Sequence, residues 1–298
     1  MALRVGLIGL GIMGSAYAAH LIDAGFATTG FDVDAAALAA FERRGGLRAG
    51  SAGEAGAGAD VVISALASVD ALEAAFFGPA GLAEAAHAGT IVVEASTFSL
   101  AVKESLRARL AARGARVLDA PVSGTGTQAR VRDLAIYASG DRSAYDAALP
   151  VLEAIARSVR YVGPYGNGSK LKYIANLLVT IHNVSTAEAV VLAQKAGLDP
   201  AEMLEIIGDG AGSSRMLHVR GPRMAAVDYA DPGMKLDVYQ KDLAIIAEFA
   251  RDVGAPTPLF SESATIHAAA LAQGRAKQDT AAVAEVLRTM AGLPPGPL

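Results

Sequence analysis

The chain has 298 residues, of which 52% are hydrophobic and 19% charged, so it can bury a large core and is not a disordered chain. Its 26 lysines and arginines stand against 30 aspartates and glutamates, a net charge of −4, so it lacks the basic excess of a nucleic-acid-binding protein. The absence of cysteine excludes disulfides, thiolate zinc sites and thiol nucleophiles, and it fits a reducing compartment.

The first segment of the chain, residues 1–13, is apolar apart from Arg4 and is followed by small residues, a pattern that loosely resembles a signal peptide. Gly6, Gly9 and Gly11 interrupt this run, and the same residues better match a strand that enters a glycine turn. No segment approaches the ~20 uninterrupted apolar residues of a membrane span. We therefore expect a cytoplasmic protein with no membrane partner.

The first half of the chain alternates short β-rich runs with alanine-rich stretches of helix length. This alternation predicts a parallel sheet with crossover helices. The expected strands are residues 3–8, 27–31, 61–66, 90–93 and 116–118. Val61-Val62-Ile63 has the apolar character of a central strand that is buried on both faces. Residues 134–138 and 159–162 are two further strand candidates, on either side of a helix around residues 144–156.

The second half is expected to be entirely helical, with a domain boundary near Pro164. Residues 169–196 contain no proline or glycine, which predicts one helix of about 28 residues and ~42 Å, at about 1.5 Å per residue. Asp199-Pro200-Ala201-Glu202 has the N-cap, the first-turn proline and the capping acid of the next helix. Further helices are predicted around residues 234–253, 261–273 and 279–290.

Gly9-Leu10-Gly11-Ile12-Met13-Gly14 is a G-x-G-x-x-G sequence directly after the first strand and at the start of a helix. Backbone N–H groups and the helix dipole can hold a pyrophosphate there. Asp32 ends the second strand, where its carboxylate can accept ribose hydroxyl groups and would repel a 2′-phosphate. These residues predict a Rossmann-type dinucleotide-binding domain that prefers NAD to NADP. The alternative for Asp32 is a turn or capping role, for which Asp34 is the better candidate.

Four segments together resemble the β-hydroxyacid dehydrogenase family, which includes enzymes of the 3-hydroxyisobutyrate dehydrogenase type and is related to 6-phosphogluconate dehydrogenase. In chain order they are residues 9–14, Asp119-Ala120-Pro121-Val122-Ser123-Gly124, Gly166-Asn167-Gly168-Ser169-Lys170-Leu171-Lys172 with Asn176, and Lys241-Asp242-Leu243. The resemblance implies a Rossmann-type doubly wound α/β sheet in residues 1–164. An all-α domain in residues 165–298 would follow, linked to the sheet by a long interdomain helix and serving for substrate binding and oligomerisation.

The resemblance implies that Ser123 and Gly124 bind the substrate carboxylate. A serine hydroxyl and exposed amides after a strand suit an oxyanion, although an ordinary polar turn remains the alternative. The family usually has a second glycine next, whereas this chain has Thr125, which adds bulk and a hydroxyl beside the carboxylate. Arg215, at the end of a polar segment that starts at Gly212, is a candidate for a second anion contact.

Lys172 aligns with the catalytic lysine of the family, so the resemblance implies that it transfers the proton that accompanies hydride transfer. Its ordinary pKa of ~10.4 would have to fall for a base working near neutral pH. Asn176, at i+4 on the same helix face, would orient the substrate or Lys172. A solvated helix lysine is the alternative for Lys172.

Three further cofactor-binding sites follow from the resemblance. They are Leu66 and Ala67 after the 61–66 strand, Ser96 and Thr97 after the 90–93 strand, and Lys241. A loop or helix-surface role is the alternative for each. The five histidines show no paired ligand spacing, so we expect no metal site.

The combined expectation is an NAD-dependent oxidoreductase that transfers a hydride between a small 3-hydroxy acid, or its semialdehyde, and nicotinamide. An imine reductase on the same scaffold is the closest alternative, but such enzymes generally lack the lysine at position 172. A nucleotide-binding sensor without catalysis is the alternative from another class, and it would need no proton donor. The alanine-rich helical half favours homo-oligomerisation, and the resemblance implies a homodimer or homotetramer.

Overall fold

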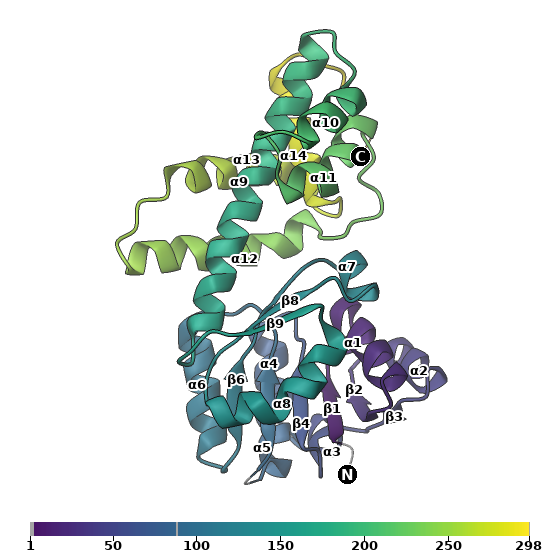
Figure 1. Ribbon diagram of the computed structural model, residues 1–298, viewed down its shortest axis with the longest axis vertical. Helices are drawn as coiled ribbons and strands as arrows, with labels where there is room; N and C mark the ends of the chain where they lie inside the picture. The colour runs from purple at the N-terminus through teal and green to yellow at the C-terminus, as the bar shows by residue number, and fades with distance from the viewer. Residues whose placement is uncertain (1–2, 88, 298) are drawn as a thin grey trace. The chain divides into compact units, whose positions relative to one another are not determined.

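The structure is a computed structural model that describes residues 3–87 and 89–297. The chain divides into two compact units, residues 1–172 and residues 173–298. The first unit contains all the strands of the described chain, and the second contains helices (Figure 1). The predicted fold class, a doubly wound α/β sheet followed by a helical part, is confirmed.

A six-stranded parallel sheet forms the centre of the first unit. In spatial order its strands are β3 (Leu47–Arg48), β2 (Ala27–Phe31), β1 (Arg4–Ile8), β4 (Val61–Ser64), β5 (Ile91–Glu94) and β6 (Arg116–Asp119). The helices between these strands are α1 (Ile12–Asp23), α2 (Ala35–Arg43), α3 (Ala52–Gly56), α4 (Val69–Phe77), α5 (Leu82–Ala85) and α6 (Leu100–Ala111). The strand order reverses between β1 and β4, and in such sheets ligands bind beyond the carboxyl ends of the strands at this point.

The sheet is covered on both faces. Alternate residues of β4 point to opposite sides, so Val61 and Ile63 pack with α1 and with α8 (Arg142–Ile155), whereas Val62 packs with α4 and α6. All four residues of β4 and all four of β5 are buried. The prediction that residues 61–63 form a central strand is therefore confirmed.

A second, smaller sheet follows the main one. It contains β7 (Val122–Ser123), β8 (Ala135–Ala138) and β9 (Ser158–Tyr161), with α7 (Gly126–Arg130) and α8 (Arg142–Ile155) in its connections. β7 is antiparallel to β8, and β8 is parallel to β9. The two late strand candidates are confirmed, but they belong to this separate sheet. A β bridge between Asp119 and Ser139 joins it to the end of β6.

The second unit is built from helices, as predicted. They are α9 (Asn167–Lys195), whose first turns belong to the first unit, then α10 (Pro200–Gly208), α11 (Arg215–Ala226), α12 (Leu236–Asp252), α13 (Pro258–Ala272), a 3₁₀ turn (Thr280–Ala282) and α14 (Val283–Met290). The sequence pattern does not predict α11, because Gly221 and Pro222 lie inside it. Gly221 has a packing reason: a Cβ atom there would lie 2.6 Å from Leu204 Cδ2 of α10.

Within the described chain, α9 is the one helix that is long and apolar enough to cross a membrane, by length and composition alone. It nevertheless contains buried polar side chains with partners. Thr180 Oγ1 donates to the Asn176 carbonyl oxygen over 2.8 Å, and Asn183 Nδ2 donates to the Thr280 carbonyl oxygen over 2.8 Å. Buried polar groups of this kind, paired within a packed unit, identify α9 as a core helix.

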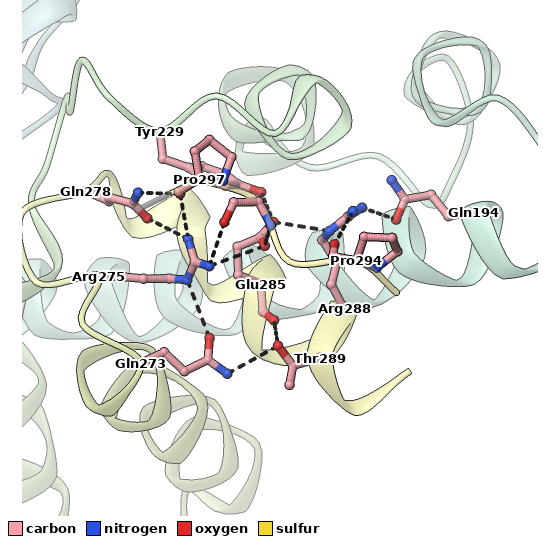
Figure 2. A network of polar contacts seen from close by, with 11 residues as sticks. Gln194, Tyr229, Gln273, Arg275, Gln278, Glu285, Arg288, Thr289, Pro294 and Pro297 are labelled. Carbon is pink, nitrogen blue, oxygen red and sulfur yellow. Dashed lines mark hydrogen bonds and ion pairs between the residues drawn. The ribbon is translucent and has the colours of Figure 1, made fainter. Parts of the chain in front are cut away.

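A buried charged network holds the segment after α14 (Figure 2). The fully buried Glu285 carboxylate lies 3.5 Å from the Arg275 guanidinium and 3.3 Å from that of Arg288. Glu285 also accepts hydrogen bonds from the Tyr229 hydroxyl over 3.0 Å and from Gly296 N over 2.6 Å. Arg275 donates to two backbone carbonyls of the same terminal segment. One carboxylate therefore joins the turn after α13, α14 itself and the terminal segment that follows it.

Because His267 in α13 is buried, we expect the stability of the folded chain to decrease at acid pH. His267 is fully buried, and its Nδ1 donates to the Ser263 carbonyl oxygen over 2.9 Å. Burial lowers the pKa of His267 from 6.5 to about 4. Between these pH values the unfolded chain binds a proton that the folded chain does not, so the free energy of unfolding falls as the pH falls from 6.5 to 4.

His267→Phe should therefore make stability less dependent on pH in this range. We expect the wild type to lose more free energy of unfolding than the variant between about pH 7 and about pH 5, as measured by urea denaturation. An equal loss in both proteins would show that His267 is protonated in the folded state as readily as in the unfolded state.

Candidate active site

The glycine turn connects β1 to α1 at the carboxyl end of the sheet. Gly9 has a φ of +91°, and a Cβ atom on Gly14 would collide with the Gly9 carbonyl oxygen, so both positions require glycine. Gly11 is the N-cap of α1 and makes no side-chain cap bond, and a Cβ atom on it would meet nothing within 4 Å. The first turn of α1 contains no acidic residue. The helix start thus offers uncapped N–H groups with room for an anion, which suits a pyrophosphate.

Asp32 lies directly after β2 and is fixed beside this turn. Its Oδ2 accepts a hydrogen bond from Leu10 N over 2.6 Å, and its Oδ1 accepts one from Asp34 N over 2.8 Å. The Asp34 carboxylate in turn accepts from Ala36 N, which confirms Asp34 as the N-cap of α2. A carboxylate oxygen can accept more than one hydrogen bond, so Asp32 retains capacity for ribose hydroxyl groups.

The loops after β4 and β5 meet next to the glycine turn. Ser96 Oγ accepts a hydrogen bond from Leu66 N over 2.9 Å, and Ala67 and Thr97 are the next residues of the two loops. A Cβ atom on Gly9 would lie 3.3 Å from Leu66 Cδ2. The first unit therefore brings the predicted cofactor residues of three loops together at the carboxyl ends of its strands.

The candidate carboxylate site lies at the end of β7. Ser123 pairs with Ala135 of β8, and Gly124 has a φ of +141°, which favours glycine. Thr125 is the N-cap of α7, and its N–H donates to Gln128 Oε1 over 3.0 Å. This capping role was not predicted, although the T-x-x-Q spacing is a capping-box pattern that could have revealed it. Thr125 is thus held in place by its own helix.

Lys172 lies in the second turn of α9 and is 7% exposed, so it is not a solvated helix lysine. The start of α9 is bound to the end of β6. Asp119 Oδ2 accepts from Ser169 N and Asp119 Oδ1 accepts from Ser169 Oγ, each over 2.8 Å. Ser169 precedes Lys172 by one helical turn, so the backbone that bears Lys172 is anchored to the sheet.

A buried charged cluster next to this anchor was not predicted. Lys103 of α6 lies 2.8 Å from Glu94 Oε2 and 2.6 Å from Asp119 Oδ1, and all three side chains have no exposed surface. Glu94 and Asp119 are register partners at the ends of β5 and β6. Burial opposes the charged ammonium, but the two carboxylates outweigh burial and raise the pKa of Lys103 above its ordinary value.

Asn176 and the segment around Lys241 meet inside the second unit. Asn176 is 6% exposed, and its Nδ2 donates to Asp242 Oδ2 over 2.9 Å. Lys241 Nζ lies 3.8 Å from Asp242 Oδ1. Asp242 therefore connects two predicted site residues, and it fixes which way the Asn176 amide points.

Arg215 is an exposed residue at the first position of α11, preceded by Ser214 as the N-cap. Arg215 was predicted to lie in a polar loop, but the loop ends at Ser214. The Ser214 hydroxyl accepts from Leu217 N over 3.1 Å. Among residues 3–87 and 89–297, no group of three or more His, Asp or Glu side chains could hold a metal ion.

Comparisons with known proteins agree with these features. A sequence model described as the NAD binding domain of 6-phosphogluconate dehydrogenase matches residues 4–163. A second, described as "NAD-binding of NADP-dependent 3-hydroxyisobutyrate dehydrogenase", matches residues 166–287. L-threonate dehydrogenase from Cupriavidus necator is 35% identical over 96% of this chain and 96% of its own length.

Solved structures extend the likeness to the whole fold. A structure of Mycobacterium tuberculosis 3-hydroxyisobutyrate dehydrogenase with L-serine is 32% identical, has a TM-score of 0.85, and is matched over 97% of this chain and 100% of that one. An imine reductase from a Pseudomonas species is 20% identical with a TM-score of 0.60, over 96% of this chain and 100% of that one; this likeness shows the fold alone. The chain therefore belongs to the β-hydroxyacid dehydrogenase family, a group of nicotinamide-dependent oxidoreductases that act on small hydroxy acids.

Proposed function

We propose that this protein is an NAD-dependent dehydrogenase that transfers a hydride between a small 3-hydroxy acid, or the corresponding semialdehyde, and nicotinamide. The observation that carries the proposal is the buried Lys172 on an anchored helix start, in the same unit as the glycine turn and Asp32. A sensor that only binds a nucleotide has no need for such a lysine. Turnover by the purified protein, followed as absorbance of NADH with a panel of 3-hydroxy acids, sugar acids and semialdehydes, tests the proposal.

NAD supplies the hydride acceptor when bound, and NADH supplies the donor in the reverse direction. In this proposal the amides of residues 9–14 hold the pyrophosphate and Asp32 holds the adenosine ribose. The remaining cofactor contacts are Leu66, Ala67, Ser96, Thr97 and Lys241. The uncapped start of α1 and the fixed Asp32 carboxylate support this arrangement.

Substrate binding is assigned to the loop after β7 and to the start of α11. Ser123, Gly124 and Thr125 would hold the carboxylate, with Arg215 as a second anion contact. L-threonate and L-serine, named for two of the relatives, are both small hydroxy carboxylates, which supports a substrate of this class.

Proton transfer is assigned to Lys172. In the oxidation direction the neutral amine accepts the hydroxyl proton of the substrate as the hydride leaves its carbon. In the reverse direction the ammonium returns that proton to the carbonyl oxygen. Asn176 orients the reacting oxygen, and the Asp242 carboxylate that accepts from its amide supports this role. Lys172 also distinguishes this proposal from an imine reductase.

Asp32 predicts the choice of cofactor. The four residues after it, residues 33–36, include no basic side chain that could bind a 2′-phosphate. We expect a higher kcat/KM with NAD than with NADP, and we expect Asp32→Ala to narrow the difference by removing the repulsion. Steady-state kinetics with both cofactors measures this, and equal use of both by the wild type would refute the assignment.

If Ser123 and the neighbouring amides bind the substrate carboxylate, activity should require a substrate that has one. Replacing the substrate carboxylate by an amide or a primary alcohol should lower kcat/KM far more than changing the distal substituent, because charge-assisted hydrogen bonds are lost. The comparison uses matched analogues of one active substrate. If uncharged alcohols of equal length react as well as the acid, the substrate class is wrong.

We further propose a cytoplasmic location and a homodimer or homotetramer, and we retain a domain boundary near residue 164. The hydrogen-bonded polar side chains of α9 support the cytoplasmic location. Exposed apolar side chains in the second unit, such as Leu192 and Met290, support the formation of an oligomer. Light scattering of the purified protein tests the oligomeric state.

A further inference from the structure

We propose that Asp119, held by Lys103, is a positioning residue that sets the place and direction of Lys172 through the start of α9. This inference rests on the proposed function, in which Lys172 transfers the proton. Asp119 contacts no residue that we assign to substrate or cofactor binding through its side chain. Its carboxylate instead accepts from Lys103 Nζ, Ser169 N, Ser169 Oγ and Ser139 Oγ.

The helix start is held at two successive N–H groups. Ser169 N donates to Asp119 Oδ2 over 2.8 Å, and Gly168 N donates to Ser139 Oγ over 3.0 Å. Ser139 Oγ also contacts Asp119 over 3.1 Å, so both bonds converge on one carboxylate. A negative charge at a helix N-terminus is stabilised by unpaired N–H groups and by the helix dipole. Asp119 thus caps α9 from 50 residues away in the chain.

Lys103 places a positive charge against this cap inside the protein. Glu94 and Asp119 are paired residues on adjacent strands, and their carboxylates would repel each other without a cation between them. Lys103 Nζ contacts both over 2.8 Å and 2.6 Å. Burying a carboxylate without a cation beside it is costly. The ion pair with Lys103 therefore supports the cap.

Close packing leaves the helix start little freedom to move. A Cβ atom on Gly168 would collide with the Tyr137 carbonyl oxygen and would lie 2.7 Å from the Asp119 carbonyl oxygen. The preceding loop is held as well, because the Tyr165 hydroxyl donates to the Lys103 carbonyl oxygen over 2.9 Å. Lys172 follows Ser169 by one turn, so a small tilt of this turn displaces the amine directly.

Asp119→Asn tests the proposal, because it keeps the shape of the side chain and removes its charge. We expect kcat to fall by about 10- to 10²-fold, the range that a displacement of about 1 Å produces in an oriented reaction. KM for the substrate and Kd for NAD, measured by titration, should change by less than about threefold, because the variant leaves both binding sets in place. A kcat equal to the wild-type value would overturn the proposal.

Combining Asp119→Asn with Lys172→Ala separates this inference from the proposed function. If Asp119 acts through Lys172, adding Asp119→Asn to Lys172→Ala should lower kcat by less than about twofold. An equal fall in both backgrounds would overturn the positioning role. If Lys172→Ala itself leaves kcat unchanged, the proposed function fails. If only Lys172→Ala lowers kcat, the proposed function stands and the positioning role is wrong.

Two further variants control for stability. Leu110→Ala removes a fully buried side chain from α6, two turns beyond Lys103 and away from the cluster. It should lower the thermal midpoint while kcat of the folded protein stays near the wild-type value. Ser169→Ala removes only the hydroxyl bond to Asp119 and should lower kcat in the same direction by a smaller factor. If Asp119→Asn fails to fold, an unchanged kcat in Ser169→Ala overturns the proposal.

Discussion

Lys172→Ala is expected to lower kcat by at least about 10²-fold, because general acid–base groups typically contribute about 10²- to 10⁴-fold. The Kd for NAD should stay nearly unchanged, because the assigned dinucleotide contacts come mainly from residues 9–14 and Asp32. Steady-state kinetics and a titration of NAD binding measure the two quantities. The loss should appear in turnover and not in cofactor binding.

Lys172→Arg is the matched variant, since it retains the positive charge. A guanidinium stays protonated at all accessible pH values and cannot act as a base, so little activity should return. A lysine without a chemical role would leave the rate of the folded protein almost unchanged when it is replaced. A Lys172→Ala protein that retains more than half of the wild-type kcat would show that another group transfers the proton.

Glu285→Gln is expected to lower the free energy of unfolding by about 3–5 kcal/mol, the usual cost of removing one partner of a buried ion pair. The Arg275 and Arg288 guanidinium groups would remain buried, and the shared carboxylate between them would be lost (Figure 2). Urea denaturation measures the change. The bond from Gly296 N should also weaken, so limited proteolysis should cut the terminal segment faster.

Asp237→Asn is the control for this comparison. Asp237 forms a 2.6 Å ion pair with Lys277, whose side chain is 81% exposed. Exposed ion pairs contribute about 1 kcal/mol or less, so the same chemical change should have a small effect there. Equal destabilisation by the two variants would mean that burial does not set the cost of losing the carboxylate at position 285.

Local patterns explain why the nucleotide-binding half could be predicted. The glycine turn is contiguous in sequence. Glycine is required at position 9 by its positive φ and by the Ala65 carbonyl oxygen next to it, and at position 14 by the Gly9 carbonyl oxygen. The capping roles of Asp34 and Asp199 also involve residues two positions away. Strands such as 61–64 are buried on both faces and are therefore apolar throughout.

Contacts between distant residues explain what the sequence did not reveal. β7 has two residues and exists because it pairs with β8, so no periodicity marks it. Lys103, Glu94 and Asp119 meet only because β5 and β6 pair in one particular register. A contact between distant residues also explains why the first compact unit extends to Lys172, because Asp119 binds the start of α9. The boundary near residue 164 and the roles of the site residues stay predictions.

The Lys103 cluster also constrains how this sequence can diverge. Its two acids and one base are fully enclosed, so replacing Lys103 alone leaves two carboxylates without a cation inside the protein, which is strongly destabilising. Substitutions that change all three together into apolar residues of similar volume carry a much smaller cost. Descendants of this chain should therefore lose Lys103 only together with both acids, and intermediates that keep Glu94 and Asp119 without a base should be rare.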